Sequence, residues 1–357
     1  MLDGRLISVI TPCGVSTGLT GVPGLSGVAS PALRRGTLDQ HPASLPRVVG
    51  SALQRPDAIG ARDNHPMPAR QLKPGQRAEL YVHDLTTGAS TLVATSSTLL
   101  FEAPNWTPDG SHLIVNGDGL LHRIAVAGGD LMPMPVQGLP ELNNDHVLSP
   151  DGATAYVSAD DGHLYAVDLA TRTTRRVSND HGPRFHHYLH GVSPDDVELA
   201  YIGLEALPDG SIRTNVYTLP TQGGLDAQLT DDDHPDDGCE YGPDGEWIYF
   251  NSERASTAPG HAQLFRMHRD GSDVQQLTFD DRVNWFPHPS PDGRRLLYLS
   301  FPAGTLGHPP DLTVRLRLIE NGRTRDLVEL PGGQGTINVP SWAPDGSGFA
   351  YVAYPFG

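Results

Sequence analysis

A short turn sequence recurs six times along the chain, as Thr-Pro-Asp-Gly or a close variant. Its prolines stand 42 to 53 residues apart, at Pro108, Pro150, Pro194, Pro243, Pro291 and Pro344. A repeat of this length indicates a solenoid, a propeller or another array. Proline presets φ, aspartate hydrogen-bonds to the nearby backbone, and glycine accepts a positive φ, so each copy predicts a tight turn at the same place in a structural unit.

Short alternating segments follow each turn and predict β-strands. "SHLIVNG" comes after the first turn and "RRLLYLS" after the fifth, with further strands such as "LYAVDL" and "TRRVS" behind them. The segment that leads into the next turn completes a unit of four strands. No helical period is visible, so the sequence predicts an all-β chain, and six such units predict a six-bladed β-propeller around a central channel.

The two ends of the repeat region complement each other. The last turn is followed by one strand, "GFAYVAYPF", whereas residues 79–85 and the later "STLVATS" form two strands that belong to no earlier turn. We expect these N-terminal strands to complete the last blade. Such closure removes sheet edges that would otherwise pair with other chains. The predicted propeller spans residues 76–357.

Residues 1–75 have a different composition. They contain no Phe, Trp, Tyr or Glu and are rich in Gly, Pro, Ser and Ala. Such a segment buries too little apolar surface to offset its ordering entropy, so we predict a mostly disordered arm. Its start, "MLDGRLISVITPCGV", matches a signal peptide poorly, which favours the cytoplasm. A periplasmic or secreted location stays open.

Charge and hydropathy exclude some classes of partner. The chain carries 25 Lys and Arg against 42 Asp and Glu, a net charge of −17. A nucleic-acid binder needs clustered basic residues to neutralise phosphates, so no nucleic-acid partner is expected. No run of 18 apolar residues is present, and no membrane span is expected.

The turns and the segments before them resemble those of TolB-type six-bladed propellers, including bacterial TolB-like proteins described as Tol biopolymer transporter components. The similar segments are "APNWTPDG" (103–110), "NNDHVLSPDG" (143–152), "YFNSER" (249–254), "NWFPHPSPDG" (284–293) and "GGQGTINVPSWAPDG" (332–346). The resemblance implies the propeller fold over residues 76–357. It implies little about function, because one fold carries many functions.

By the same resemblance, the strand before each turn is the innermost one, and its polar residues face the channel. Ordinary packing would place Val, Leu or Ala there. We therefore predict a channel-mouth site for a small molecule or an oligosaccharide. The expected substrate-binding residues are Asn105, Asn144, Asp237, Arg254, Asn284, Trp285 and Asn338. The alternative is that these side chains only hydrogen-bond to loops and channel water.

Histidines and carboxylates in the same segments suggest catalysis. His146, His190 and His288 could together hold one divalent metal ion, with manganese, zinc and calcium all considered. Such an ion would polarise a substrate oxygen. The expected acid and base residues are Glu240, Asp145 and His187.

Oligogalacturonate lyases are similar propellers that hold manganese with several histidines and a glutamine in the channel. This resemblance implies a metal-assisted lyase or hydrolase acting on an oligosaccharide or a modified sugar. The sequence departs from the family's ligand pattern, because Gln334 is not followed by histidines. The second hypothesis is a non-catalytic scaffold that binds a protein or a peptide in its channel. Both hypotheses stay open at this point.

Overall fold

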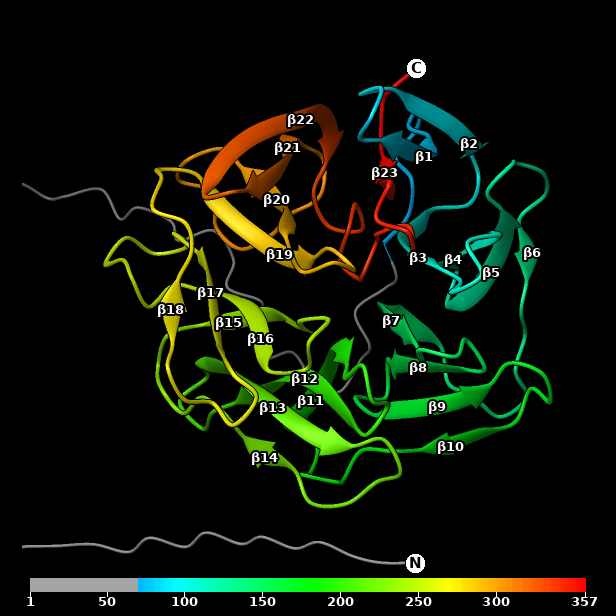
Figure 1. Cartoon of the computed structure of the whole chain (residues 1–357). Helices are drawn as coiled ribbons and strands as arrows, with labels where there is room; N and C mark the ends of the chain where they lie inside the picture. Colours follow the sequence, from blue (N-terminus) through cyan, green and yellow to red (C-terminus); the bar gives the residue numbers. More distant parts are fainter. Residues whose placement is uncertain (1–69) are drawn as a thin grey trace, which may run out of the picture. The chain divides into compact units, whose positions relative to one another are not determined.

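The computed structural model describes residues 70–357, and all regular elements in this range are β-strands. They form six sheets arranged around one central axis (Figure 1). The predicted all-β, six-bladed propeller is therefore confirmed. None of the described residues belongs to a helix that is long and apolar enough to cross a membrane.

Five of the six blades are four-stranded antiparallel sheets whose strands follow chain order. The first contains β3 (Phe101–Trp106), β4 (His112–Gly117), β5 (Leu120–Ala125) and β6 (Met132–Pro133). The second contains β7 (Leu142–Leu148), β8 (Thr154–Ala159), β9 (Leu164–Asp168) and β10 (Thr174–Arg176). The third contains β11 (Phe185–Val192), β12 (Glu198–Ala206), β13 (Ile212–Pro220) and β14 (Ala227–Gln228).

The fourth and fifth blades repeat this arrangement. The fourth contains β15 (Asp236–Tyr241), β16 (Trp247–Ser252), β17 (Gln263–His268) and β18 (Gln275–Gln276). The fifth contains β19 (Val283–Pro289), β20 (Arg295–Phe301), β21 (Leu312–Glu320) and β22 (Arg323–Gly332). In each of these five blades the first strand lies innermost in the ring (Figure 1).

The sixth blade joins the two ends of the described chain. In it, β1 (Ala78–Asp84) lies between β2 (Ser90–Ser96) and β23 (Gly348–Ala353), with Leu80 opposite Val352. This confirms the predicted closure. The fourth strand is reduced to one bridge between Trp342 and Phe349. Pro340 and Pro344 flank Trp342 and have no N–H to donate, so a regular ladder cannot form there.

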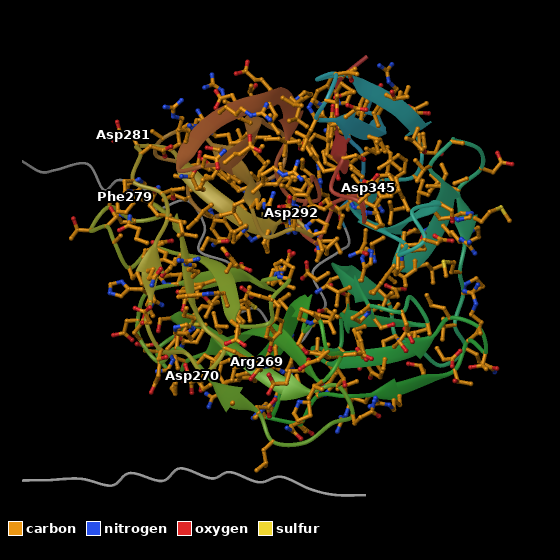
Figure 2. The ribbon with its side chains drawn as sticks, in the orientation of Figure 1. Arg269, Asp270, Phe279, Asp281, Asp292 and Asp345 are labelled. Carbon is orange, nitrogen blue, oxygen red and sulfur yellow. The ribbon has the colours of Figure 1, made fainter. Side chains whose placement is uncertain are left out.

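The six recurring turns have the expected backbone. The glycine of five of them adopts a φ of +68° to +71°, and Asp196 takes the same place with a φ of +55°. In the first turn, Asp109 accepts hydrogen bonds from Thr107 and Ser111, which hold the pKa of its carboxyl well below its usual range. Figure 2 labels the equivalent Asp292 and Asp345, which lie where their blades approach the centre of the ring.

The inner strands β3, β7, β11, β15 and β19 each contain a β-bulge against their neighbour. In β15 the register shifts between Asp237 and Glu240, and the intervening Gly238 has a φ of +62°. A bulge inserts an unpaired residue and redirects the side chains around it. The hydrophobic core fills the spaces between neighbouring sheets, as where Trp285 and Leu316 share a buried cluster with Phe349. The side chains at the bulges therefore line the channel, because the hydrophobic core lies between the sheets.

The described chain enters the propeller before the predicted boundary at residues 75 and 76. Lys73 pairs with Asp311 at 2.8 Å, and Gly75 accepts a hydrogen bond from the Gly357 N–H. The predicted disorder of the arm and the location inferred from its start concern residues 1–69, which lie outside the described part. Both stay predictions.

The first turn offers a test of the backbone argument. Nothing lies within 4 Å of a Cβ placed on Gly110, so Gly110→Ala adds backbone strain without a clash. Left-handed backbone costs a residue with a Cβ about 1–2 kcal/mol, and we expect the free energy of unfolding to fall by that amount in a denaturant titration. Gly110→Asn, which tolerates this conformation better, should lose less. Equal losses for the two variants would contradict the argument.

Candidate functional site

Side chains from different blades meet in the channel because of the bulges. His190 of the third blade is itself the unpaired residue of its bulge, between Leu189 and Gly191. It contacts Asp237 of the neighbouring fourth blade and the Asn338 carbonyl, which lies between β22 and β23. The channel therefore holds a polar cluster around the buried His190 imidazole.

His190 has a carboxylate on one side and a backbone carbonyl on the other. Its Nε2 lies 3.0 Å from Asp237 Oδ1, and its Nδ1 lies 3.2 Å from the Asn338 carbonyl oxygen, which can only accept. Burial lowers the pKa of His190, but Asp145 and Asp237 outweigh it and raise the pKa to about 9. His190 is thus an imidazolium at neutral pH and donates from both nitrogens.

Asp145 lies beside His190 without a full set of partners. Its side chain is buried, and its Oδ1 makes no hydrogen bond. Burial raises the pKa of Asp145 to about 7, helped by the charges of Asp237 and Glu102 and opposed by His190. A carboxyl that titrates near neutral pH fits the acid or base role predicted for Asp145.

Glu240 and His288 form a second buried pair. His288 Nδ1 lies 2.5 Å from Glu240 Oε2, and His288 Nε2 lies 2.5 Å from the Ile337 carbonyl oxygen. Because a carbonyl oxygen only accepts, His288 Nε2 donates to the Ile337 carbonyl, and Nδ1 faces Glu240 Oε2. Burial raises the pKa of Glu240, and His288 opposes that rise.

The turn end of the channel is hollowed next to this pair. Two adjoining hollows of about 210 Å³ each share Asn105, Trp106, Glu240, Tyr241 and Pro340 as lining. Turn prolines form much of the remaining wall, namely Pro108, Pro150, Pro243, Pro291 and Pro344. Glu240 is the one acidic residue that lines these hollows within the described chain.

The opposite ends of the inner strands carry an arginine that the sequence did not single out. Arg70 donates to Glu102 at 2.8 Å and to the Gln334 carbonyl at 2.6 Å, and pairs with Asp311 at 3.2 Å. Its guanidinium lies 4.1 Å from the centre of the Tyr354 ring. This end of the channel therefore holds a guanidinium between carboxylates and an aromatic face.

The three histidines predicted to share a metal ion have different surroundings. His146 is buried beside Ile114 of the first blade, and burial lowers its pKa to about 4. His190 and His288 use their ring nitrogens as described above. Among residues 70–357, the one group of His, Cys, Asp and Glu side chains with metal-ligand proximity is His181, His187 and Asp226. The channel histidines as placed do not fit a shared ion.

The remaining predicted residues divide between the channel and the blades. Asn338 lies in the channel wall, where its Oδ1 accepts from the Gly335 N–H, and Asn144 is buried with its amide nitrogen unpaired. Trp285 packs on His308, which faces Asp237 at 3.7 Å. The structure thus adds His308 to the cluster.

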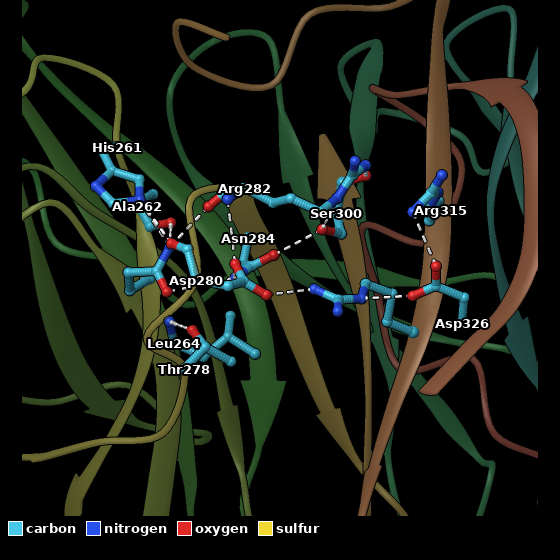
Figure 3. Close-up of polar contacts among 12 residues, drawn as sticks. His261, Ala262, Leu264, Thr278, Asp280, Arg282, Asn284, Ser300, Arg315 and Asp326 are labelled. Carbon is cyan, nitrogen blue, oxygen red and sulfur yellow. Dashed lines mark hydrogen bonds and ion pairs between the residues drawn. The ribbon is translucent and has the colours of Figure 1, made fainter. Parts of the chain in front are cut away.

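Three predicted residues serve other contacts. Asn284 bonds to Ser300 and Asp280 inside the fifth blade (Figure 3). Arg254 pairs with Asp236, with each carboxylate oxygen 2.9 Å away. His187 donates from Nδ1 to the Gly162 carbonyl and does not join the His190 cluster. These placements separate the three side chains from the channel groups.

An alignment of the six repeats on their turn prolines could have identified Glu102 as a channel residue. Glu102 stands six residues before its turn proline, as do Asn144, Asp237 and Asn338. Arg70 carried no such signal, because it precedes the first strand in a segment of unusual composition.

This site belongs to a closed six-bladed propeller with a polar channel, and comparisons define the family. Residues 142–354 match the model of the TolB beta propeller domain. The chain is 40% identical over 263 residues to an uncharacterized protein of Agrobacterium fabrum (strain C58), covering 71% of this chain and 85% of that one. The protein therefore belongs to the TolB β-propeller family.

Solved structures agree. A candidate TolB from Agrobacterium tumefaciens has a TM-score of 0.71 and 36% identity, and the match covers 78% of this chain and 99% of that chain. An oligogalacturonate lyase in complex with manganese has a TM-score of 0.51 and 17% identity, covering 73% and 75% of the two chains. At this low identity, the similarity to the lyase supports the propeller fold and nothing about function.

The Asp145 carboxyl predicts a pH dependence of stability. Its pKa in the folded protein is about 7, above its value in the unfolded chain, so its favourable contribution is present at low pH and is lost as the pH rises to about 7. The advantage in unfolding free energy of Asp145→Asn over the wild type should grow from pH 4 to 7 and then level off, in denaturant titrations at several pH values. A difference independent of pH would contradict this assignment.

The Arg70 contact predicts a large loss of stability. Arg70→Ala leaves Glu102 buried without its partner, and removing one member of a buried ion pair costs about 3–5 kcal/mol. Arg70→Ala combined with Glu102→Gln should recover part of that loss, because no buried charge remains unpaired. Unfolding midpoints of the two variants measure this, and an unchanged Arg70→Ala protein would refute it.

Proposed function

We propose that this protein is a binding module whose turn-end channel mouth accepts a segment of a partner protein that carries a basic side chain. The observation that carries the proposal is the Glu240 carboxylate, which lines hollows otherwise walled mainly by prolines, Trp106 and Tyr241. A basic side chain in the hollows would approach this carboxylate from the side opposite its His288 contact. Charge-assisted hydrogen bonds of this kind are stronger than neutral ones.

The chain itself holds a guanidinium in the way proposed for the partner. At the other end of the inner strands, Arg70 donates to Glu102 and stacks over Tyr354. At the turn end, Glu240 supplies the carboxylate and Trp106 supplies an aromatic ring beside it in the lining of both hollows. Arg70 therefore serves as an internal example of the recognition that we propose.

The walls of the hollows suit an extended peptide. Prolines and aromatic rings bind extended, proline-containing segments well, because such segments lose little entropy on binding. The chain's net charge of −17 favours a basic partner by long-range attraction. Protein–protein contact would also bring additional surface beyond hollows of about 210 Å³.

The alternative predicted from the sequence is metal-assisted cleavage of an oligosaccharide. It requires His146, His190 and His288 to present free nitrogens to one ion, and it requires basic groups for an acidic sugar. The described channel instead presents Asp145, Glu240 and an imidazolium whose nitrogens both donate. We therefore favour the binding module and keep turnover of a sugar as an outcome of the test.

The test uses the full chain without an affinity tag and two capped peptides of the same length. One has arginine between two prolines, and the other has glutamine there. Trp106 and Trp342 line the hollows, so binding should change tryptophan fluorescence, with calorimetry as a second readout. We expect the arginine peptide to bind more tightly. Glu240→Gln should weaken it at least tenfold, since a charged hydrogen bond contributes about 1.5–3 kcal/mol.

Glu329→Gln is the matched control, because Glu329 is exposed on the outermost strand β22 and should leave binding unchanged. Equal binding of both peptides, or full binding by Glu240→Gln, would contradict the proposal. A trimer of galacturonate is incubated in parallel with added manganese. Appearance of an unsaturated product, followed by ultraviolet absorbance, would favour the lyase alternative.

A further inference from the structure

Three metal-ligand side chains meet outside the channel cluster, among loops of the second and third blades. His181 precedes β11, His187 lies within it, and Asp226 precedes β14. One ligand atom from each lies within 4.8 Å of the others. His187 is buried and His181 is exposed, so the group is closed on one side and open to solvent on the other.

His187 is oriented as a ligand. Its Nδ1 lies 2.7 Å from the Gly162 carbonyl oxygen, which only accepts, so the proton of the neutral ring is on Nδ1. Nε2 then carries a lone pair, and it has no hydrogen-bond partner although the side chain is only 1% exposed. A buried acceptor without a donor is costly unless something fills its place.

Asp226 is held by an outer set of donors. Tyr201 donates its hydroxyl to Oδ1 at 2.8 Å, and Asn179 donates to Oδ2. His181 Nε2 lies 3.0 Å from the same Oδ2. Ligands in metal sites are commonly fixed by such secondary hydrogen bonds, and the Gly162 carbonyl on His187 is another example.

We propose that His181, His187 and Asp226 bind a divalent transition-metal ion, with zinc as the best match to two imidazoles and one carboxylate. The ion takes the place of the proton between His181 and Asp226, and it satisfies the free Nε2 of His187. Ligand atoms of a tetrahedral zinc site lie about 3.3 Å apart, so the three ligand atoms, which now lie within 4.8 Å of one another, adjust their spacing on binding. The fourth position faces solvent and takes water.

The experiment measures zinc affinity of the tag-free full chain by competition with a chromophoric chelator. We expect one zinc per chain. His181→Ala and His187→Ala should each weaken binding at least tenfold, and Tyr201→Phe should weaken it less than either. Because His181 is exposed, its variant should keep the wild-type melting temperature, which separates lost binding from misfolding. Cobalt should give the visible absorption bands of a tetrahedral complex with the wild type and lose them with His181→Ala.

His186→Ala is the matched control, since His186 is the neighbouring imidazole on the same strand and is not in the cluster. It should bind zinc as the wild type does. His190→Gln should also keep the zinc, which assigns the ion to this cluster and not to the channel. No zinc at micromolar concentration, or zinc retained by both His181→Ala and His187→Ala, would overturn the proposal.

Discussion

The pairing of β1 with both β2 and β23 is the interaction on which the rest of the structure depends. The ladder between β1 and β23 fastens the start of the described chain to its end, so the ring of blades cannot open without breaking that ladder. Closure brings the inner strands β3, β7, β11, β15 and β19 to one axis. Their bulges then turn polar groups into the channel, including Asp145, His190 and Glu240. The closed ring therefore determines the chemistry of the channel as well as its stability.

Concentrating carboxylates on one axis has an electrostatic cost, and the chain offsets it with bases from other blades. His190 faces Asp237, His288 faces Glu240, and Arg70 faces Glu102. Each base uses its N–H groups on these contacts and on backbone carbonyls. The same histidines therefore stabilise the channel but are not free to hold a shared metal ion. Glu240 lines the turn-end hollows, and the proposed capture of a basic side chain depends on this carboxylate.

The turns and strands could be predicted from the sequence because they depend on local chemistry and on a period of two. The directions of the channel side chains could not, because a bulge shifts that period by one residue. His146 and His190 both stand four residues before their turn prolines, yet His146 pairs in register with Val157 whereas His190 is the unpaired residue of its bulge. His187, which was predicted to act as an acid or base in the channel, instead bonds to the Gly162 carbonyl and lies outside the His190 cluster. The role of Arg70 could not be predicted, because its partners Glu102 and Gln334 lie far along the chain and no local sequence pattern indicates such contacts.

The central claim is that the buried imidazole of His190 is committed as a proton donor to Asp237 and to the Asn338 carbonyl. Nitrogen NMR of the histidine rings in the full chain tests this most directly, with His190→Gln used for assignment. We predict that both ring nitrogens of His190 carry protons at pH 7.5 and that one is lost only near pH 9. A His190 ring with one unprotonated nitrogen at pH 7.5 would contradict the account, because that nitrogen would be free to bind a metal.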